Sequence, residues 1–353
     1  MLRIGPFSFE LPVVQAALSG YSDAAMRLIA RRLGAPYCLH EVVLDKIVIQ
    51  PGKLQREILD VMAEDHPVGG QLMGAQPEQF AAAAEVMARN GYDVIDVNFG
   101  CPVRKVLGRC RGGFLLSDPP TAIEIIRRVR EVVPAATPVT VKMRRGTDDS
   151  PESERNFFEI LEAAWDAGVA AVTVHGRTVE QRYVGPSDWR FLERVKRHAG
   201  PRTILGSGDL FTAEDVVRML ESTGVDGVTV ARGCIGYPWI FRECRELLAG
   251  RPLPEPPSVA EQGRVIREHY ELIARTQGPR MAPRVMRKFG IKFSELHPLS
   301  RPVRDAFIRA STEAQWLALL DQWYDPARDW PPVQRKSGPG ELIAAGAMLE
   351  CET

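Results

Sequence analysis

Short runs of apolar and β-branched residues alternate along the chain with longer segments whose apolar positions recur at helical spacing. The longer segments, such as residues 77–90 and 119–133, predict amphipathic helices. Alternating strands and helices are typical of a parallel sheet, and eight repeats over about 240 residues predict a closed (β/α)8 TIM barrel. The runs expected to form its strands are residues 13–19, 37–43, 67–74, 94–100, 139–144, 171–177, 203–209 and 227–233.

An open, doubly wound sheet is the main alternative for the same alternation of elements. Such a sheet usually carries the fingerprint G-x-G-x-x-G in the turn after its first strand. No such fingerprint follows the first apolar run. The pattern therefore favours the barrel.

The character of the chain changes at Gly250. The segment GRPLPEPP is rich in proline, which indicates a stiff, extended linker. The residues after it carry helical patterns and no strand pattern, whereas the tail from Pro331 is polar and rich in proline and glycine. We expect a barrel domain over residues 1–249, a linker over 250–257, a small helical domain over 258–330, and a flexible tail over 331–353 with one short helix around Glu341–Leu349.

The composition is that of an ordinary globular protein. The 353 residues are 45% hydrophobic and 25% charged, and 45 basic residues balance 45 acidic ones. No stretch approaches the roughly 20 apolar residues that a membrane span needs. The 6 cysteines form no C-x-x-C pair and no spacing with histidine that suits zinc or an iron–sulfur cluster. We expect a reduced, cytoplasmic protein without a membrane segment, a metal or an obligate protein partner.

Polar and glycine-rich residues end most of the predicted strands. Active sites of barrel enzymes are built at the carboxyl ends of the strands, so these residues are expected to meet on one face. They are Gln71, Asn98, Gly100, Cys101, Lys142, Arg144, His175, Arg177, the segment G-S-G-D at 206–209 and the segment A-R-G at 231–233.

The endings of the seventh and eighth strands indicate a phosphate site. Loops at these positions are the usual phosphate-binding place in barrels. Gly206 and Gly208 allow close approach of the backbone, and Arg232 adds a guanidinium fork. The segment G-S-G-D alone would be equally consistent with a tight turn before a helix. Its pairing with A-R-G one repeat later favours phosphate.

Lys142 and His175 are expected to be functional for the same positional reason. A lysine that ends a buried strand is costly unless it is paired, although a surface lysine with a buried stem would also fit. A single histidine is more often structural, but H-G-R at a strand end favours a functional group.

Cys101 lies between Gly100 and Pro102, in a turn rather than inside a strand or helix. The thiol there could act as a nucleophile, as a proton donor, or as an inert packing group. A nucleophile needs a base or a helix amino terminus to form thiolate, whereas a proton donor needs the neutral thiol. The residues alone leave these roles open, and Cys110 is a second, weaker candidate.

Basic residues gather in the predicted helical domain. Residues 280–309 hold eight basic and two acidic side chains, a local net charge of +6 in a chain that is balanced overall. A solvated helix face is the ordinary explanation. The asymmetry favours a polyanionic partner, whose binding would depend steeply on salt. The basic residues are Arg280, Arg284, Arg287, Lys288, Lys292, Arg301, Arg304 and Arg309.

Several motifs together resemble those of the tRNA-dihydrouridine synthases. The resemblance is collinear from about residue 13 to 245 and continues loosely through M-R-K-F at 286–289. The motifs are N-F-G-C-P-V-R-K-V at 98–106, G-G-F-L-L at 112–116, V-K-M-R at 141–144, V-H-G-R-T at 174–178, G-S-G-D at 206–209 and A-R-G-C-I-G-Y-P-W-I-F at 231–241.

The resemblance implies FMN at the barrel mouth, NADPH as reductant, and a helical domain that helps to hold tRNA. By this analogy hydride reaches C6 of a flipped-out uracil, and Cys101 protonates C5. Lys142 would stabilise the reduced flavin ring. The other implied cofactor contacts are Ala17, Leu18, Gln71, His175, Ser207, Gly208, Asp209, Ala231 and Arg232. The implied contacts to uracil or RNA are Asn98, Arg144, Arg177 and Tyr183.

The chain departs from the family pattern at a few positions. Ala17 and Leu18 replace Pro-Met, Ser207 replaces an asparagine, Arg111 stands where the family usually carries small residues, and Phe289 replaces a histidine. Two other functions therefore stay open: a flavin-dependent dihydropyrimidine or dihydroorotate type of oxidoreductase, and a non-catalytic tRNA-binding relative. The +6 cluster disfavours the first, and the joint presence of a thiol, a lysine and a histidine disfavours the second.

Overall fold

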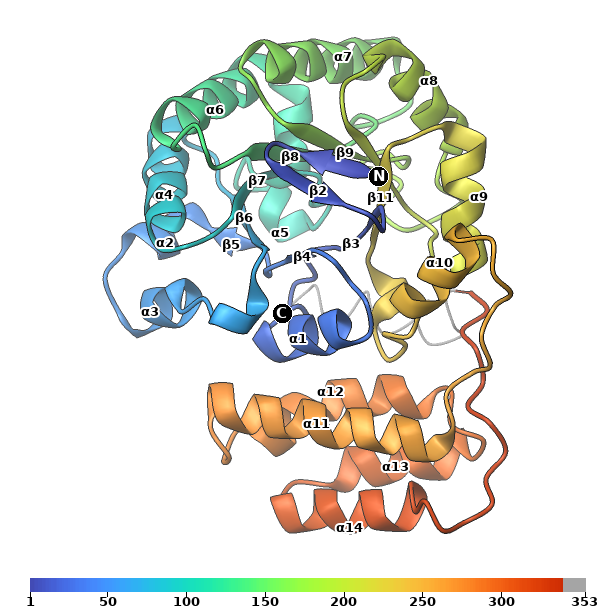
Figure 1. The fold of residues 1–353 in the computed structure, drawn as a ribbon. Coiled ribbons are helices and arrows are strands. Elements are labelled where there is room, and N and C mark those ends of the chain that lie inside the picture. The colour runs from blue at the N-terminus through green and yellow to red at the C-terminus, as the bar shows by residue number, and fades with distance from the viewer. Residues whose placement is uncertain (339–353) are drawn as a thin grey trace.

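The computed structural model describes residues 1–338 and confirms the predicted barrel (Figure 1). Eight parallel strands form a closed ring, in which β4 pairs with both β3 and β6. Each predicted run contains one of them. The strands are β3 (Val13–Gln15), β4 (Cys38–Leu39), β6 (Val68–Met73), β7 (Val94–Phe99), β8 (Val139–Arg144), β9 (Ala171–His175), β10 (Ile204–Ser207) and β11 (Gly227–Val230), and β5 (Val43–Leu44) extends the pairing of β6.

Helices surround the strands and bury their apolar faces against the sheet. Side-chain caps explain where several begin: Asp118 accepts from the amide of Thr121, and Thr212 forms a capping box with Asp215. The main helices are α1 (Ala24–Arg32), α4 (Pro77–Arg89), α6 (Pro119–Val132), α7 (Pro151–Asp166), α8 (Trp189–Ala199), α9 (Ala213–Thr223) and α10 (Ile240–Leu248). Shorter elements are α2 (Asp45–Ile49), α3 (Lys53–Leu59), α5 (Arg104–Leu107) and the 3-10 turns η1 (Ala63–Asp65), η2 (Gly112–Ser117) and η3 (Arg232–Cys234).

A hairpin closes the amino end of the barrel, which the sequence pattern did not predict. Strands β1 (Leu2–Ile4) and β2 (Phe7–Phe9) pair antiparallel and lie across the ring in Figure 1. Leu2 and Phe9 are buried in a cluster with Val14 and Leu205 from the barrel strands. This apolar plug fills the amino end, so the carboxyl end is the one available for a site.

Four helices form the carboxyl-terminal region, as expected: α11 (Val259–Gln277), α12 (Ala282–Ser294), α13 (Ser300–Arg309) and α14 (Glu313–Trp323). They pack beside α1 and α10 (Figure 1). The indole of Trp239 donates to Glu261 at 2.7 Å, and the ring of Tyr21 meets Phe289 edge-on at 5.5 Å between centroids. The two parts of the chain therefore share a packed interface.

Residues 331–338 lie along the linker and return to the barrel. Val333 is buried and its amide donates to the carbonyl of Pro257 at 3.2 Å, while the amide of Gln334 donates to Leu296 at 2.9 Å. The helix expected around Glu341–Leu349 lies outside the described residues. Among the helices of residues 1–338, none has the length and apolar character that crossing a membrane requires.

One buried ion pair anchors α1 and predicts a large effect on stability. Arg27 Nε donates to Asp65 Oδ2 at 2.8 Å, and both side chains are almost fully buried. Asp65→Asn is expected to leave the guanidinium charge unpaired and to lower the free energy of unfolding by about 3–5 kcal/mol. Chemical denaturation followed by circular dichroism measures the change. Glu124→Gln, which breaks the exposed Arg128–Glu124 pair, is the control and should leave the midpoint unchanged.

Candidate active site

The structure brings the polar strand ends together at the carboxyl end of the barrel. Strand register places Asn98 beside Lys142, Arg144 beside His175, and His175 beside Ser207. These residues come from four consecutive strands of one closed sheet. The pairing of these parallel strands therefore brings the predicted side chains together at one end of the barrel.

A buried hydrogen-bond network links β6, β7 and β8 beneath this end. Gln71 Nε2 donates to Asp96 Oδ2 at 2.6 Å, and Asn98 Nδ2 donates to Gln71 Oε1 at 2.7 Å. Thr140 Oγ1 donates to the other oxygen of Asp96 at 2.5 Å. Burial raises the pKa of Asp96 above its ordinary value. Asp96 was not a sequence candidate, although a carboxylate among the apolar residues of VIDVNF was a usable signal.

The turn that carries Cys101 is fixed from two sides. Asn98 Oδ1 accepts from the amides of Gly100 at 2.9 Å and Cys101 at 3.1 Å. Gly113 N donates to the carbonyl of Cys101 at 3.0 Å, and a Cβ at Gly112, where φ is +57°, would lie 2.8 Å from the Cβ of Cys101. These bonds define the position of Cys101, which is half-buried rather than enclosed. Cys110 is exposed.

Arg144 ties the Cys101 turn to the loop after β9. Its Nε donates to the carbonyl of Gly100 at 2.9 Å, and its Nη1 donates to those of Thr178 and Arg182, both at 2.7 Å. The side chain is only 3% exposed. These bonds favour a positioning role over the RNA-phosphate contact that the resemblance implies.

Lys142 brings a positive charge into the centre of the site. Burial and, to a smaller extent, the charge of Arg144 lower its pKa to about 8, although Asp96 and Cys101 oppose the shift. The ammonium form therefore predominates at neutral pH, but it loses its proton more readily than a surface lysine does.

His175 is a neutral imidazole. Burial lowers its pKa well below the ordinary value, and the surrounding cations Arg144, Lys142, Arg177 and Arg232 act in the same direction. The amide of Arg177 donates to Nδ1 at 3.2 Å, which leaves the imidazole hydrogen on Nε2. His175 therefore offers an N–H donor toward the mouth-side loops, where Gly208 lies against it.

Two loops form a backbone cradle that suits an anion. Within residues 1–338 the amide N–H groups of Asp209 and Gly233 donate to no acceptor. A Cβ at Gly208, where φ is +111°, would lie 2.4 Å from Ser187 Oγ, so glycine is required there. Trp189 Nε1 donates to the carbonyl of Gly208 at 3.1 Å and orients that peptide. Sequence reasoning missed Trp189, because nothing local links it to the cradle.

Asp209 holds the cradle through its side chain. Its carboxylate oxygens each accept from Arg177 Nη2 at 2.8 Å, and Oδ2 also accepts from the amide of Ser187 at 2.7 Å. Arg232 lies 3.7 Å from the same carboxylate. The carboxylate is thus neutralised internally, and the backbone of Asp209 rather than its side chain can meet an anion.

A cavity of about 400 Å³ opens beside the cradle. The guanidinium of Arg232 lies over the rings of Tyr183 and Phe211, at 5.2 and 5.0 Å from their centroids. Tyr183 is 43% exposed, whereas Arg177 is buried. Tyr183 is therefore the more accessible of these two predicted substrate contacts.

The first strand end is held through its main chain. Ser22 Oγ accepts from the amide of Leu18 at 2.8 Å and donates to its carbonyl at 3.2 Å. Ala17 and Leu18 are half-buried, and Ser207 is buried beside His175. The expected cofactor contacts from these positions remain predictions.

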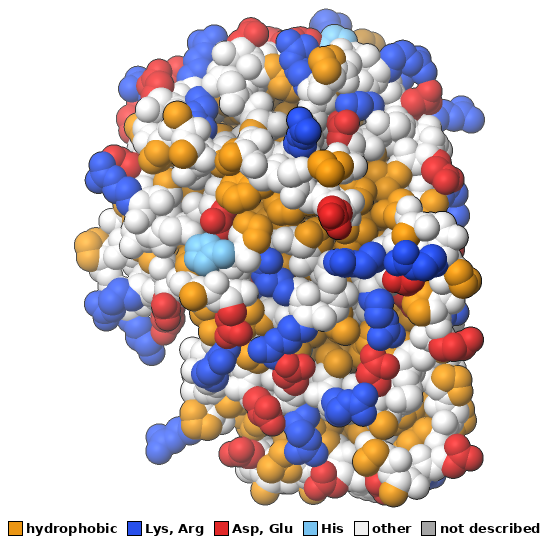
Figure 2. All heavy atoms as spheres, viewed as in Figure 1, with side chains coloured by type: hydrophobic (Ala, Val, Ile, Leu, Met, Phe, Trp, Pro, Cys, Tyr) orange, Lys and Arg blue, Asp and Glu red, His pale blue; other side chains and the backbone are white. Residues whose placement is uncertain are grey.

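The basic cluster of the helical region is only partly available to a partner. Lys288 donates to the carbonyl of Gly20 and lies over the rings of Tyr21 and Phe289, and Lys292 pairs with Glu295 at 2.9 Å. On the face in Figure 2, basic and acidic side chains are mixed over the helices. The exposed members are Arg280, Arg284, Arg301 and Arg309.

Comparison with known families decides the relationship. The dihydrouridine synthase (Dus) family model matches residues 14–326. The chain belongs to the dihydrouridine synthase family. A probable tRNA-dihydrouridine synthase of Mycobacterium tuberculosis is 35% identical over 332 residues, which cover 91% of this chain and 84% of the relative. The tRNA-dihydrouridine synthase B of Xanthomonas campestris is 32% identical over 324 residues, covering 92% and 96%.

Solved structures place this dihydrouridine synthase family member among barrel proteins of the same fold. Histamine dehydrogenase from Rhizobium sp. 4-9 superposes with a TM-score of 0.54 at 16% identity, over 77% of this chain and 50% of that chain. A 2-naphthoyl-CoA reductase superposes with a TM-score of 0.57 at 11% identity, over 95% and 70%. The chain thus spans 50% of the length of the dehydrogenase and 70% of that of the reductase. The likeness concerns the fold alone.

The bonds of Arg144 predict that two loops depend on one side chain. Arg144→Met removes the donors to Gly100, Thr178 and Arg182, so faster amide hydrogen exchange is expected in both residues 98–113 and residues 176–185. The neighbouring Arg145 bonds Gln181 but not the Cys101 turn. Arg145→Met is the control, and it should leave exchange in 98–113 unchanged. Equal protection of 98–113 in Arg144→Met and the parent protein would contradict this role.

Proposed function

We propose that this protein reduces a uridine of tRNA to 5,6-dihydrouridine, with FMN at the carboxyl end of the barrel and NADPH as reductant. The observation that carries the proposal is a positioned thiol, Cys101, near the half-buried ammonium of Lys142 and an anion cradle in one barrel mouth. Membership of the dihydrouridine synthase family supports it. We expect a protein with this substrate to act in the cytoplasm.

The residues present suit a flavin mononucleotide. The amides of Asp209 and Gly233, which donate to no acceptor among residues 1–338, suit the phosphate together with the nearby Arg232, and Gly208 leaves the backbone accessible. Gln71 and His175 offer polar groups for the ring and ribityl chain, and the neighbouring Ala17, Leu18, Ser207 and Ala231 complete the expected contacts. When bound, the flavin takes two electrons from NADPH and supplies a hydride to C6 of the uracil.

Lys142 would stabilise negative charge that develops on the flavin ring. Its ammonium predominates below its pKa of about 8. The buried Asp96 helps to keep it charged, since their mutual attraction opposes the effect of burial. A fixed positive group in a site that excludes water stabilises charge more strongly than one in solvent.

Cys101 would complete the reduction by protonating C5. Addition of hydride at C6 and of a proton at C5 saturates one double bond, and the resulting thiolate regains its proton from solvent. Asn98 has one amide hydrogen that is unpaired within the described residues, and it holds the turn of the thiol. We assign to Asn98, Tyr183 and Arg177 the role of orienting a flipped-out base.

Replacement of Cys101 separates chemistry from binding. Cys101→Ala is expected to keep affinity for FMN and for tRNA, while turnover falls by roughly 10²–10⁴ because the general acid is lost. Mass spectrometry of the tRNA product measures turnover as a gain of about 2 Da per reduced uridine, the mass of the two added hydrogens. Cys110→Ala, at an exposed cysteine, is the control with unchanged turnover. Full turnover in Cys101→Ala would exclude the thiol from the reaction.

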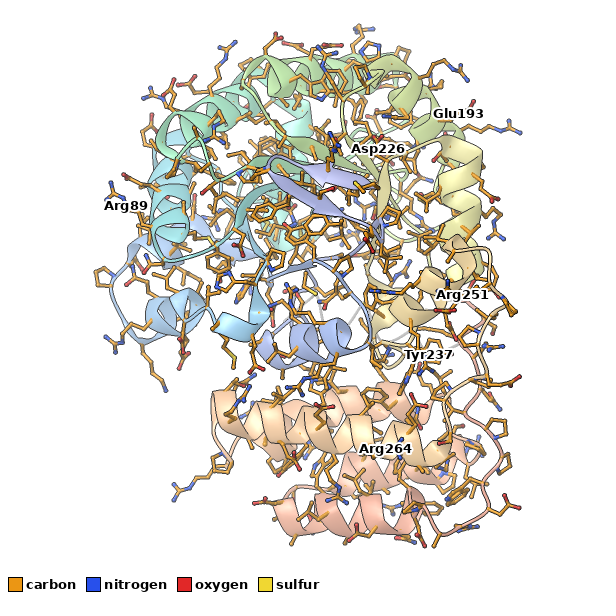
Figure 3. All side chains as sticks on the ribbon, viewed as in Figure 1. Arg89, Glu193, Asp226, Tyr237, Arg251 and Arg264 are labelled. Atoms are coloured by element: carbon orange, nitrogen blue, oxygen red, sulfur yellow. The ribbon has the colours of Figure 1, made fainter. Side chains whose placement is uncertain are left out.

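We assign the holding of tRNA to the helical domain, residues 258–330, and to the exposed part of its basic cluster. Arg284→Gln combined with Arg301→Gln should weaken tRNA binding and lower the slope of log affinity against log salt by roughly one to two, because fewer counterions are released. Filter binding at several salt concentrations measures both. Arg89→Gln with Arg197→Gln removes the same charge from exposed helices of the barrel (Arg89 is labelled in Figure 3) and should change neither.

A further inference from the structure

A segment beyond the part matched by the family model reaches the cradle. The family model ends at residue 326. Residues 331–338, which we call the strap, follow α14 in the chain and run beside the linker (Figure 1). The strap reaches the turn η3 through Lys336. Ser337 and Gly338 of the strap line the cavity that Arg232 and Tyr183 also line.

Lys336 is the residue through which the strap meets the cradle. Its Nζ donates to the carbonyl of Arg232 at 2.6 Å and to that of Ile235 at 3.0 Å. The side chain is only 9% exposed. Burial lowers its pKa to about 8, so the ammonium form still predominates at neutral pH. A lysine buried to this extent is costly to place, unless its charge is satisfied by acceptors such as these carbonyls.

The contact determines where an amide points. The carbonyl of Arg232 and the N–H of Gly233 belong to one planar trans peptide, so they point in opposite directions. The carbonyl of Arg232 accepts from Lys336 and, at 3.4 Å, from the amide of Ile235. These two bonds hold the peptide so that its N–H points away from them. The N–H of Gly233 is one of the two cradle amides that donate to no acceptor within residues 1–338.

The other cradle loop is held in the same way. Trp189 Nε1 donates to the carbonyl of Gly208, which shares a peptide with the N–H of Asp209, the other cradle amide. Each cradle amide is thus oriented by a side chain that bonds the carbonyl behind it. Trp189 lies within the barrel, whereas Lys336 comes from the carboxyl-terminal strap.

The strap has its own anchors, so Lys336 is brought to η3 in a defined way. Arg335 donates to the carbonyl of Pro254 in the linker and lies 3.4 Å from Glu243. Glu243 accepts from the hydroxyl of Tyr237 at 2.6 Å, at the junction of the two regions (Tyr237 is labelled in Figure 3). Together with the buried Val333, these contacts hold the strap against the linker and α10.

We propose that Lys336 is a positioning residue for phosphate binding, through which the strap preorganises the β11 side of the cradle for the phosphate of the flavin nucleotide. The proposal rests on the proposed function, because it takes FMN as the occupant of the cradle. It goes further by making the phosphate affinity of the barrel depend on a segment outside the matched family region.

The test compares two flavins that share the ring system and differ in the phosphate. Full-length Lys336→Met is titrated with FMN and with riboflavin, and binding is followed by quenching of flavin fluorescence. The dissociation constant for FMN is expected to rise about tenfold, which is in the range for loss of a charge-assisted hydrogen bond, while that for riboflavin changes less than about twofold. Lys336→Gln, which keeps an N–H donor without the charge, should show a smaller rise and replaces Lys336→Met if that variant does not fold.

Lys196→Met is the matched control. Lys196 Nζ also donates to two carbonyls, those of Gly200 at 2.9 Å and Arg202 at 3.1 Å, and pairs with Asp226 at 2.7 Å. Asp226, labelled in Figure 3, precedes β11 and so lies at the amino end of the barrel. The control should leave both flavin affinities unchanged.

The possible outcomes distinguish failure of the strap proposal from failure of the proposed function. Unchanged FMN affinity in both Lys336 variants would overturn the proposal while leaving the proposed function intact. An equal loss for FMN and riboflavin would also overturn it, because the strap would then support the barrel as a whole. Absence of FMN binding by the parent protein would overturn the proposed function, and the strap proposal with it.

Discussion

The site depends on one recurring interaction, in which a buried or half-buried side-chain donor bonds the backbone carbonyls of a strand-end loop. Arg144 does so for the Cys101 turn, Trp189 for the loop after β10, and Lys336 for the loop after β11. A loop at the carboxyl end of a barrel strand has no neighbouring strand to pair with, so its polar backbone needs other partners. Because the carbonyls are satisfied from behind, the amides and the thiol can face the mouth.

The same arrangement sets the charge of the site. Lys142, Arg144, Arg177 and Arg232 lie close enough to His175 to disfavour its protonation. The buried carboxylate of Asp96 and the half-buried carboxylate of Asp209 compensate only part of this charge, and Asp209 is shared between two arginines. The mouth therefore combines positive charge with neutral donors, a combination that suits an anionic cofactor and a ring that becomes electron-rich on reduction.

Local sequence patterns predicted the features that depend only on residues close together in the chain. The strand runs, the glycine endings and the motif around Cys101 each lie within a few residues, and pairing of parallel strands brings them together without further information. The roles of Asp96, Trp189 and Lys336 depend on contacts between distant segments; Lys336 meets a loop 104 residues earlier. The hairpin β1–β2 was missed because its two strands have 3 residues each, too few for a periodic signal.

Two of the departures from the family pattern, at Leu18 and Phe289, fall where the main chain or the packing determines what the residue does. Leu18 is fixed by Ser22 through its backbone amide and carbonyl, so a change of side chain there leaves the strand end in place. Phe289 is buried between Tyr21 and His269, with Lys288 over its ring. An aromatic ring at this position joins the loop after β3 to α11 and α12 by packing. The replacement of histidine by phenylalanine therefore affects the interface of the two regions, and through Tyr21 the first strand end, rather than a direct contact with RNA.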